Sequence, residues 1–203
     1  MDTPKSTKTQ YANSLSETQI RAEWAEVERA KQNPAMFRPL YQRHYNAIFR
    51  FIYQRILEEE TTADLTAQVF LKTMQNLQRY HCKEPDPVPF SALLYQIATN
   101  EVNYYYRQTN KRRVIALEDY HVEKLEDEVN DDNYDVNLAA VKNFMQQLSP
   151  KEVMLLQLRY FQRPPMQFKE IATVMEIEEN AAKTRSSRLI EKLRRALGGQ
   201  NNG

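Results

Sequence analysis

Apolar residues recur at helical spacing along most of the chain. Over residues 34–56 they follow an i, i+3, i+4 pattern, which predicts a helix of about five turns. A second stripe predicts a helix that is capped by Thr61 or Thr62 and ends near residue 77, and a third predicts a helix over about 90–107. These helices together define one predicted domain, residues 36–113.

Two further segments border these helices. Residues 17–31 predict a helix with Ser16 as its N-cap and with Trp24 on the face that we expect to dock on the first domain. With the polar start of the chain, expected to be disordered, this helix forms an N-terminal extension, residues 1–35. Residues 81–89 contain three prolines in nine positions, which excludes helix interior and predicts an ordered loop.

The last part of the chain, residues 138–203, predicts a domain of four helices. Ser149, Pro150 and Glu152 form a restart signal, with Ser149 as N-cap and Pro150 at the first helical position. A short helix, a turn at 176–178 and a longer helix then follow, which is the layout of a helix-turn-helix motif. The predicted helices cover about 137–147, 150–161, 167–175 and 179–197.

Composition supports an all-α fold. All three glycines, Gly198, Gly199 and Gly203, lie in the last six positions, so the body of the chain is poorly suited to tight hairpins or phosphate-cradling loops. The single cysteine, Cys82, excludes an intrachain disulfide. The start is polar and no apolar run reaches membrane-spanning length, so we expect a cytoplasmic protein without membrane insertion.

Catalytic and metal-binding patterns are absent from the sequence. The three histidines lie in separate segments without ligand spacing, and no HExxH, Walker-type or G-x-S-x-G motif occurs. The carboxylates near Asp64 are explained by the N-terminal turn of a helix, where negative charge is favourable. We therefore expect no enzymatic activity, no catalytic residues, no metal and no cofactor.

The net charge of +1 conceals a segmental pattern. Residues 36–113 carry 11 Lys and Arg against 7 Asp and Glu, a net charge of +4. Residues 114–137 carry 1 against 9, a net charge of −8, and residues 138–203 carry 11 against 6, a net charge of +5. Two basic blocks joined by an acidic linker suggest that the blocks contact a polyanion. The alternative is that the charges are solvated surface.

The last predicted helix has one apolar seam and a cationic, hydroxyl-bearing remainder. Such a surface suits DNA, because Arg and Lys contact phosphates and guanine edges while Ser and Thr contact either phosphate or base. An ordinary surface helix rich in Lys and Arg is the alternative. The candidate DNA-binding residues are Lys183, Thr184, Arg185, Ser187 and Arg188.

The end of the third predicted helix suggests a second type of DNA contact. Asn100, Asn103, Tyr104 and Arg107 supply two amides, a ring and a cation beside a basic exit, a combination that can hold unstacked bases. Tyr104, Tyr105 and Tyr106 are consecutive and therefore point about 100° apart, so we expect at least one of them in the core. The alternative is that all are packing residues.

At these residues the chain resembles the extracytoplasmic-function (ECF) group of bacterial RNA polymerase sigma factors, within the sigma-70 family. The resemblance covers roughly residues 36–197 and falls into two blocks in the expected order. The first includes Ala63-Asp64-Leu65-Thr66 through Lys72 and Phe90 through Asn100. The second includes Leu148-Ser149-Pro150, Lys169-Glu170-Ile171-Ala172 and Ala182-Lys183-Thr184-Arg185.

The chain departs from the family's usual pattern at several positions. Ala67 and Gln68 replace a common Gln-Glu pair, Leu93 replaces a frequent Trp, and Tyr104 replaces a frequent Asp. Glu176 occupies the turn where the family commonly has Gly. Because positive φ is costly for any other residue, we expect a different backbone in this turn.

The resemblance implies roles for the two blocks. Asp64, Gln68, Phe70 and Leu71 would dock on the clamp helices of the polymerase β′ subunit. The loop 81–89 would hold a base flipped from the −10 non-template strand, which Asn100, Asn103, Tyr104 and Arg107 would line. Lys183, Thr184, Arg185, Ser187 and Arg188 would read the −35 element. The implied partners are core RNA polymerase, through its β′ clamp and β subunit, promoter DNA and an anti-sigma factor.

Two other functions fit part of the sequence. A helix-turn-helix regulator that acts without polymerase would explain the last block, and it predicts a homodimer that binds duplex DNA alone. A helical adaptor that binds only protein would leave the basic faces solvated, and it predicts no salt-dependent DNA binding.

Overall fold

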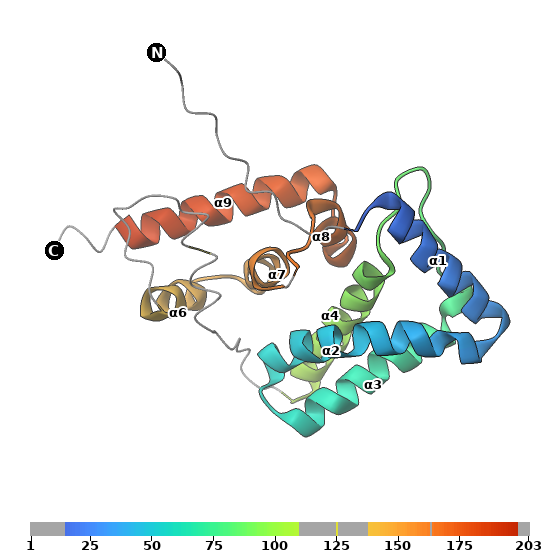
Figure 1. The fold of residues 1–203 in the computed structure, drawn as a ribbon. Coiled ribbons are helices and arrows are strands. Elements are labelled where there is room, and N and C mark those ends of the chain that lie inside the picture. Colours follow the sequence, from blue (N-terminus) through green and yellow to red (C-terminus); the bar gives the residue numbers. More distant parts are fainter. Residues whose placement is uncertain (1–14, 110–124, 126–137, 163, 199–203) are drawn as a thin grey trace, which may run out of the picture.

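The computed structural model describes residues 15–109, 125, 138–162 and 164–198, and within these ranges it contains helices and no strands. The all-α fold class is therefore confirmed. The predicted acidic linker, residues 114–137, lies outside the described residues except for Leu125, whose side chain is fully buried. Figure 1 shows the arrangement of the helices.

Helix α1 (Glu17–Gln32) packs on the N-terminal helices as the sequence indicates. Ser16 and Gln19 form a reciprocal capping box at its start, which satisfies backbone groups that the first turn leaves without a helical partner. Its buried face carries Ile20, Trp24 and Val27. A short 3-10 turn, η1 (Pro34–Phe37), connects it to the next helix.

Three longer helices form the rest of the N-terminal half. They are α2 (Arg38–Ile56), α3 (Glu59–Gln75) and α4 (Phe90–Thr109), with the short turn η2 (Leu77–Arg79) after α3. Helix α3 begins earlier than predicted, with Glu58 as N-cap. The hydroxyl groups of Thr61 and Thr62 bond back to Glu58 from inside the first turn, so neither threonine is the cap.

The C-terminal half contains the four helical segments that the sequence predicts. They are α6 (Leu138–Gln146), α7 (Pro150–Leu156) continued by the π-helical turn η3 (Gln157–Phe161), α8 (Phe168–Met175) and α9 (Glu179–Gly198). Ser149 caps α7 through a capping box with Glu152. In α9, Ala182, Leu189 and Leu193 are buried, in agreement with the predicted apolar seam.

The expectation of a different backbone at Glu176 is wrong. Glu176 adopts the left-handed conformation with φ 54° and ψ 48°, which is the geometry that a glycine would provide. The cost for a non-glycine residue is about 1–2 kcal/mol. Its amide caps the C-terminus of α8, and its carboxylate accepts a hydrogen bond from Gln96 Nε2 at 2.7 Å, so two contacts hold the residue in place.

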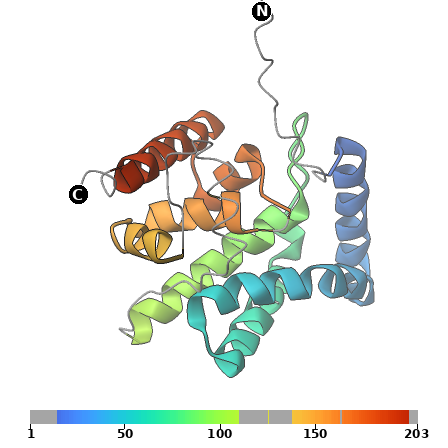
Figure 2. The same cartoon turned by 60° about the vertical axis from the view of Figure 1, so that its left-hand side comes forward.

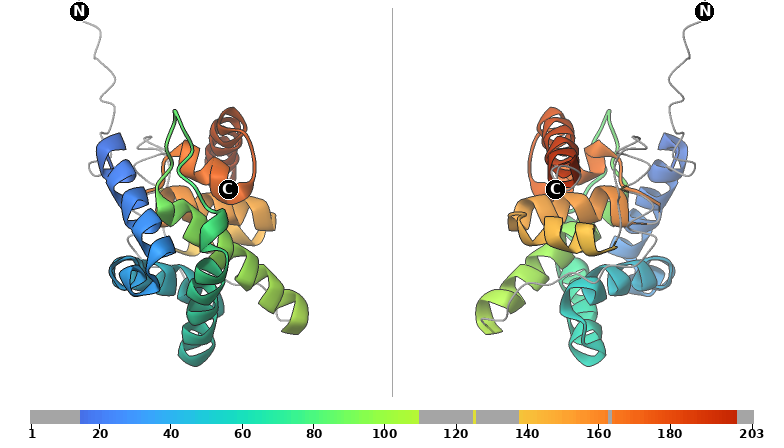
Figure 3. Two further views of the ribbon diagram at one scale, coloured as in Figure 1. Left: turned by 90° about the vertical axis from the view of Figure 1, so that its right-hand side faces the viewer. Right: turned by 90° about the vertical axis from the view of Figure 1, so that its left-hand side faces the viewer.

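The two halves pack against each other along α4. This helix contacts α1, α2 and α3, and α8 also packs on it (Figure 2). Helix α9 lies at the opposite end of the molecule from α2 and α3, and the C-terminal end of α4 extends away from it (Figure 3). In this arrangement the two regions with candidate DNA-binding residues are at different ends of the molecule.

A buried polar contact joins the halves near the end of α2. Gln157 is fully buried, and its Oε1 accepts a hydrogen bond from Arg55 Nε at 2.5 Å. Its Nε2 donates to Gln54 Oε1 at 2.8 Å and to the carbonyl of Phe51 at 3.3 Å. We refer to these contacts of Gln157 with Phe51, Gln54 and Arg55 as the polar clasp.

Candidate nucleic-acid interface

Helix α9 presents a cationic surface to solvent. Its inner side is held by the buried seam and by Ser186, whose hydroxyl lies 2.8 Å from that of Tyr160. Lys192 adds a contact to Glu152 of α7 at 3.1 Å. These anchors fix the rotation of α9, so the opposite side of the helix faces outward. All five candidate residues on that side are exposed: Lys183, Thr184, Arg185, Ser187 and Arg188.

The five residues differ in how far they are already engaged. Lys183 pairs with Glu179 at 2.5 Å, and the hydroxyls of Thr184 and Ser187 donate to carbonyl groups one turn earlier in the helix. Arg185 and Arg188 have no hydrogen-bond or ion-pair partner within the described part of the chain. Two guanidinium groups three positions apart on a helix are therefore available for phosphates or guanine edges.

A second candidate surface lies on the C-terminal half of α4. Asn100, Asn103, Tyr104 and Arg107 follow i, i+3, i+4, i+7 spacing and form one stripe along the helix. Asn100, Tyr104 and Arg107 are exposed and Asn103 is half-buried. Tyr104 is 52% exposed, and the Arg107 guanidinium carbon lies 6.0 Å from the centroid of its ring.

One of the three consecutive tyrosines is a core residue, as the helical geometry predicts. Tyr106 is buried, and its hydroxyl donates to the carbonyl of Arg55 at 2.5 Å. Tyr105 is partly buried against the core. The interpretation in which all three rings are packing residues is wrong, because Tyr104 is exposed.

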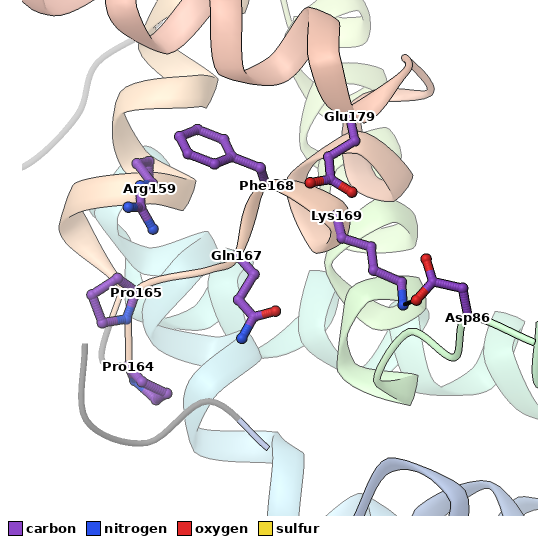
Figure 4. Close-up of a pocket in the computed structure, with 8 residues that line it drawn as sticks. All are labelled: Asp86, Arg159, Pro164, Pro165, Gln167, Phe168, Lys169 and Glu179. Carbon is purple, nitrogen blue, oxygen red and sulfur yellow. Dashed lines mark hydrogen bonds and ion pairs between the residues drawn. The ribbon is translucent and has the colours of Figure 1, made fainter. Parts of the chain in front are cut away.

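The proline-rich loop 81–89 stands beside α8 and α1. Its tip, residues 83–86, is exposed, whereas Pro87, Val88 and Pro89 are buried. Asp86 forms an ion pair with Lys169 of α8 (Figure 4). A cavity of about 390 Å³ lies at this contact and is lined by Asp86, Arg159, Pro164, Pro165, Gln167, Phe168, Lys169 and Glu179.

The candidate polymerase-docking residues on α3 separate into exposed and buried positions. Asp64, Gln68 and Leu71 are exposed at i, i+4, i+7 spacing, and the Leu71 side chain is 49% exposed. Phe70 differs, because it is 3% exposed and packs against the rings of Phe37 and Tyr41. Its ring therefore supports the surface from beneath and cannot itself contact a partner in this conformation.

An aromatic ladder on α2 was not identified from the sequence. Tyr41, Tyr45, Phe49 and Tyr53 stand one turn apart, with centroid separations of 5.3, 6.0 and 6.1 Å along the series. Tyr41 and Tyr53 are 38% and 41% exposed, so this side of α2 is partly open to solvent. The i, i+4 spacing of four rings was the signal that could have indicated this second face.

A buried carboxylate connects α1 to two other helices. Glu23 is 4% exposed, accepts a hydrogen bond from the Phe90 amide at 3.1 Å and lies 2.7 Å from His44 Nε2. Burial raises its pKa, but His44, the Phe90 amide and Arg43 outweigh this effect, so the pKa of Glu23 lies below its ordinary value. Glu23 is therefore a charged anchor rather than a proton donor at neutral pH.

No group of three or more His, Cys, Asp or Glu side chains is placed to hold a metal ion in the described residues. None of the described helices is both long enough and apolar enough to cross a membrane.

Family models match both halves of the chain. The model of sigma-70 region 2 matches residues 40–113, and the model of sigma-70 region 4 matches residues 144–195. The ECF RNA polymerase sigma factor BldN of Streptomyces coelicolor is 29% identical over 177 residues, which cover 84% of this chain. The match spans 64% of the length of that relative.

One solved structure shares the fold, and a second is similar over most of the chain. The structure of CnrH in complex with the cytosolic domain of CnrY superposes with a TM-score of 0.57 at 22% identity, covering 88% of this chain and 98% of that one. The sigma factor RpoE in complex with the anti-sigma factor NepR from Bartonella quintana has 17% identity and a TM-score of 0.49, covering 80% of this chain and 96% of that one.

Proposed function

Since the chain belongs to the ECF group of the sigma-70 family, we propose that it directs core RNA polymerase to a promoter. The observation that carries this proposal is the pair of candidate surfaces, one on α4 within the region 2 match and one on α9 within the region 4 match. The polymerase would catalyse RNA synthesis, and this chain would supply promoter recognition without being an enzyme. It would therefore act in the cytoplasm, where the polymerase is.

We assign recognition of the −35 element to α9. The exposed and unengaged Arg185 and Arg188 can each bond a guanine edge bidentately, and a bidentate pair contributes about 1–3 kcal/mol of discrimination. Lys183, Thr184 and Ser187 flank them and would contact phosphates, which set the register of the helix on the duplex.

We assign recognition of the −10 element to the α4 stripe and the loop 81–89. The exposed Tyr104 ring offers a stacking platform, and stacking is worth about 1–3 kcal/mol for each base. Asn100 and Asn103 can bond base edges, and Arg107 can neutralise backbone charge. Bases gain these contacts only when they leave the duplex, so the stripe favours melted DNA over paired DNA.

Core polymerase would dock on the α3 stripe of Asp64, Gln68 and Leu71. Phe70 would position this stripe rather than contact the polymerase, because its ring is buried. The aromatic ladder adds further exposed apolar surface on the neighbouring helix, and such surface is typical of protein contacts. An anti-sigma factor that covered the same surface would keep the chain away from the polymerase.

The proposed function requires the two halves to separate. Elements centred near −10 and −35 are about 25 base pairs apart, or about 85 Å at 3.4 Å per base pair. A compact chain of 203 residues has a radius of gyration of about 17 Å, and thus a diameter on the order of 45 Å. Residues 110–137 join α4 to α6, and 28 residues can span at most about 95 Å. The chain can therefore bridge both elements only after α8 leaves α4.

In vitro transcription tests the proposal directly. The purified chain would be added to bacterial core polymerase with a genomic promoter library, and core polymerase alone would serve as the blank. We expect new transcripts that start downstream of a shared pair of sequence elements. Failure to bind core polymerase, or binding without any initiation, would overturn the proposal.

Two variants of α9 sharpen this experiment. Arg188→Ala should reduce transcription from the selected promoters, whereas Arg195→Ala should not. Arg195 is an exposed arginine on the same helix, but it is engaged with Glu191 one turn earlier. Tight duplex binding by a homodimer without polymerase would favour the helix-turn-helix regulator, and an absence of salt-dependent DNA binding would favour the adaptor.

A further inference from the structure

Helix α1 lies outside the part of the chain that the region 2 model matches, yet its side chains contact the loop 81–89 and both of its flanks. We propose that α1 positions this loop for capture of the flipped base, and that Arg21 and Trp24 are the positioning residues. The inference rests on the proposed function of the loop and extends it to a helix that has no assigned role.

The entry to the loop is tied to the C-terminal end of α1. Gln78 Nε2 donates to the carbonyl of Lys31 at 3.0 Å, and Lys31 Nζ lies 3.2 Å from His81 Nδ1. These contacts fix the chain where it leaves η2. They are made at the surface, so each one contributes little alone.

The exit of the loop is held by buried groups of α1. Trp24 Nε1 donates to the carbonyl of Val88 at 2.7 Å, and the Trp24 ring packs edge-on against Phe90 at a centroid distance of 5.5 Å. Glu23, the residue before Trp24, accepts a hydrogen bond from the Phe90 amide. Both α1 side chains are at most 7% exposed. A buried hydrogen bond of this kind is costly to lose, because the carbonyl group would be left without a partner and away from water.

The exposed tip of the loop is held by Arg21. Its guanidinium pairs with the Glu84 carboxylate and also donates to the carbonyl of Pro85 at 3.3 Å. The hydrogen bond to Glu84 raises the pKa of Arg21 and lowers that of Glu84, which agrees with an ion pair. Helix α1 thus contacts the loop at its entry, tip and exit, and Lys169 of α8 adds an ion pair with Asp86 at the tip. A loop held in this way presents its surface without the entropy cost that ordering it on DNA would otherwise add.

Two variants separate positioning from folding. Trp24→Phe keeps a ring against Phe90 but removes the donor to Val88. Arg21→Ala removes the tip contact at an exposed site. Arg29→Ala is the matched control, because Arg29 is an exposed α1 arginine whose side chain has no hydrogen-bond or ion-pair partner within the described residues.

The test uses the full chain assembled with core polymerase. The probe is a single-stranded non-template oligonucleotide that carries the −10 sequence selected in the transcription experiment, with 2-aminopurine at each position in turn. We expect Arg21→Ala and Trp24→Phe to weaken binding of this probe about tenfold, the size of one or two net hydrogen bonds. Affinity for core polymerase and for −35 duplex DNA should stay unchanged. Hydrogen exchange in residues 81–90 should become faster in both variants.

Charge reversal provides a rescue. Arg21→Glu should weaken binding of the probe. Arg21→Glu combined with Glu84→Arg should restore most of this binding. If the wild-type chain initiates transcription but Arg21→Ala and Trp24→Phe match Arg29→Ala, the inference is overturned while the proposed function stands. Equal losses in core binding and probe binding would also overturn it, since they indicate a general defect. If the wild-type chain with core polymerase could not initiate transcription, the proposed function itself would be refuted.

Discussion

Replacing Gln157 with alanine should release the two halves of the chain from each other. Gln157 is fully buried at the start of η3, and its amide makes all three hydrogen bonds of the polar clasp. When the halves separate, water can satisfy the same amide. Gln157→Ala therefore removes stabilisation from the closed arrangement and almost none from an open one.

The size of the effect follows from these contacts. The bond from Arg55 involves a charged donor and is worth about 1.5–3 kcal/mol, and the two bonds to Phe51 and Gln54 are worth about 1 kcal/mol each. The sum is about 3.5–5 kcal/mol. Even the lower value shifts a closed-to-open equilibrium more than a hundredfold, because each 1.4 kcal/mol is a factor of ten. The remaining contacts between the halves would oppose this shift. They include the packing of α8 on α4 and the polar contacts of Tyr95 with Gln162, Gln96 with Glu176, and Asp86 with Lys169.

Energy transfer between two dyes measures the separation. Cysteines at Gln75 of α3 and Glu191 of α9, both exposed positions, would be labelled in a chain with Cys82→Ser. Gln157→Ala should lower the transfer efficiency, and Gln146→Ala should not, because Gln146 is exposed on α6. If both variants kept the efficiency of the parent chain, the polar clasp would not determine closure and the reasoning would be refuted.

Three further predictions concern the candidate sites and the N-terminal half. Arg185→Ala should weaken binding of −35 duplex by about 1–3 kcal/mol in a fluorescence titration of the holoenzyme; an unchanged affinity would exclude base contact by this residue. Asp64→Arg should abolish co-purification with core polymerase while leaving the thermal midpoint unchanged, because Asp64 is exposed; normal co-purification would contradict the docking role. Because the folded pKa of Glu23 lies below 4.5, its contribution to stability is present above pH 4.5 and is lost as the pH falls through the folded pKa. Glu23→Gln should therefore flatten the fall of unfolding free energy below pH 4.5 in urea titrations, and an equally steep fall in the variant would refute the assignment.

The positions of the candidate surfaces were largely predictable from sequence, because helical periodicity and capping residues are local. The apolar seam of α9 specifies which side of the helix faces outward, and all five candidate residues on that side are exposed. The consecutive tyrosines could be separated by the same geometry, since residues 100° apart cannot share a face. Ser149 and Glu152 identified the start of α7 through groups that lie within one turn.

Errors arose where a neighbour distant in the sequence decides the outcome. The resemblance implied a polymerase-docking role for Phe70, but the structure buries its ring against those of Phe37 and Tyr41. Glu176 retains the left-handed conformation because the end of α8 and Gln96 of α4 hold it there. The propensity of a single residue could not indicate either contact.

The sequence by itself determined the helices, their outward faces and the resemblance to sigma factors, because each depends on residues within a few turns of one another. Only the tertiary structure decided that α1 contacts the loop 81–89 and its flanks, and that Gln157 lies against Arg55, 102 positions away in the chain. The physical reason is that hydrogen bonds between distant segments depend on how whole helices pack, and packing is set by the sum of many weak contacts that no local pattern encodes.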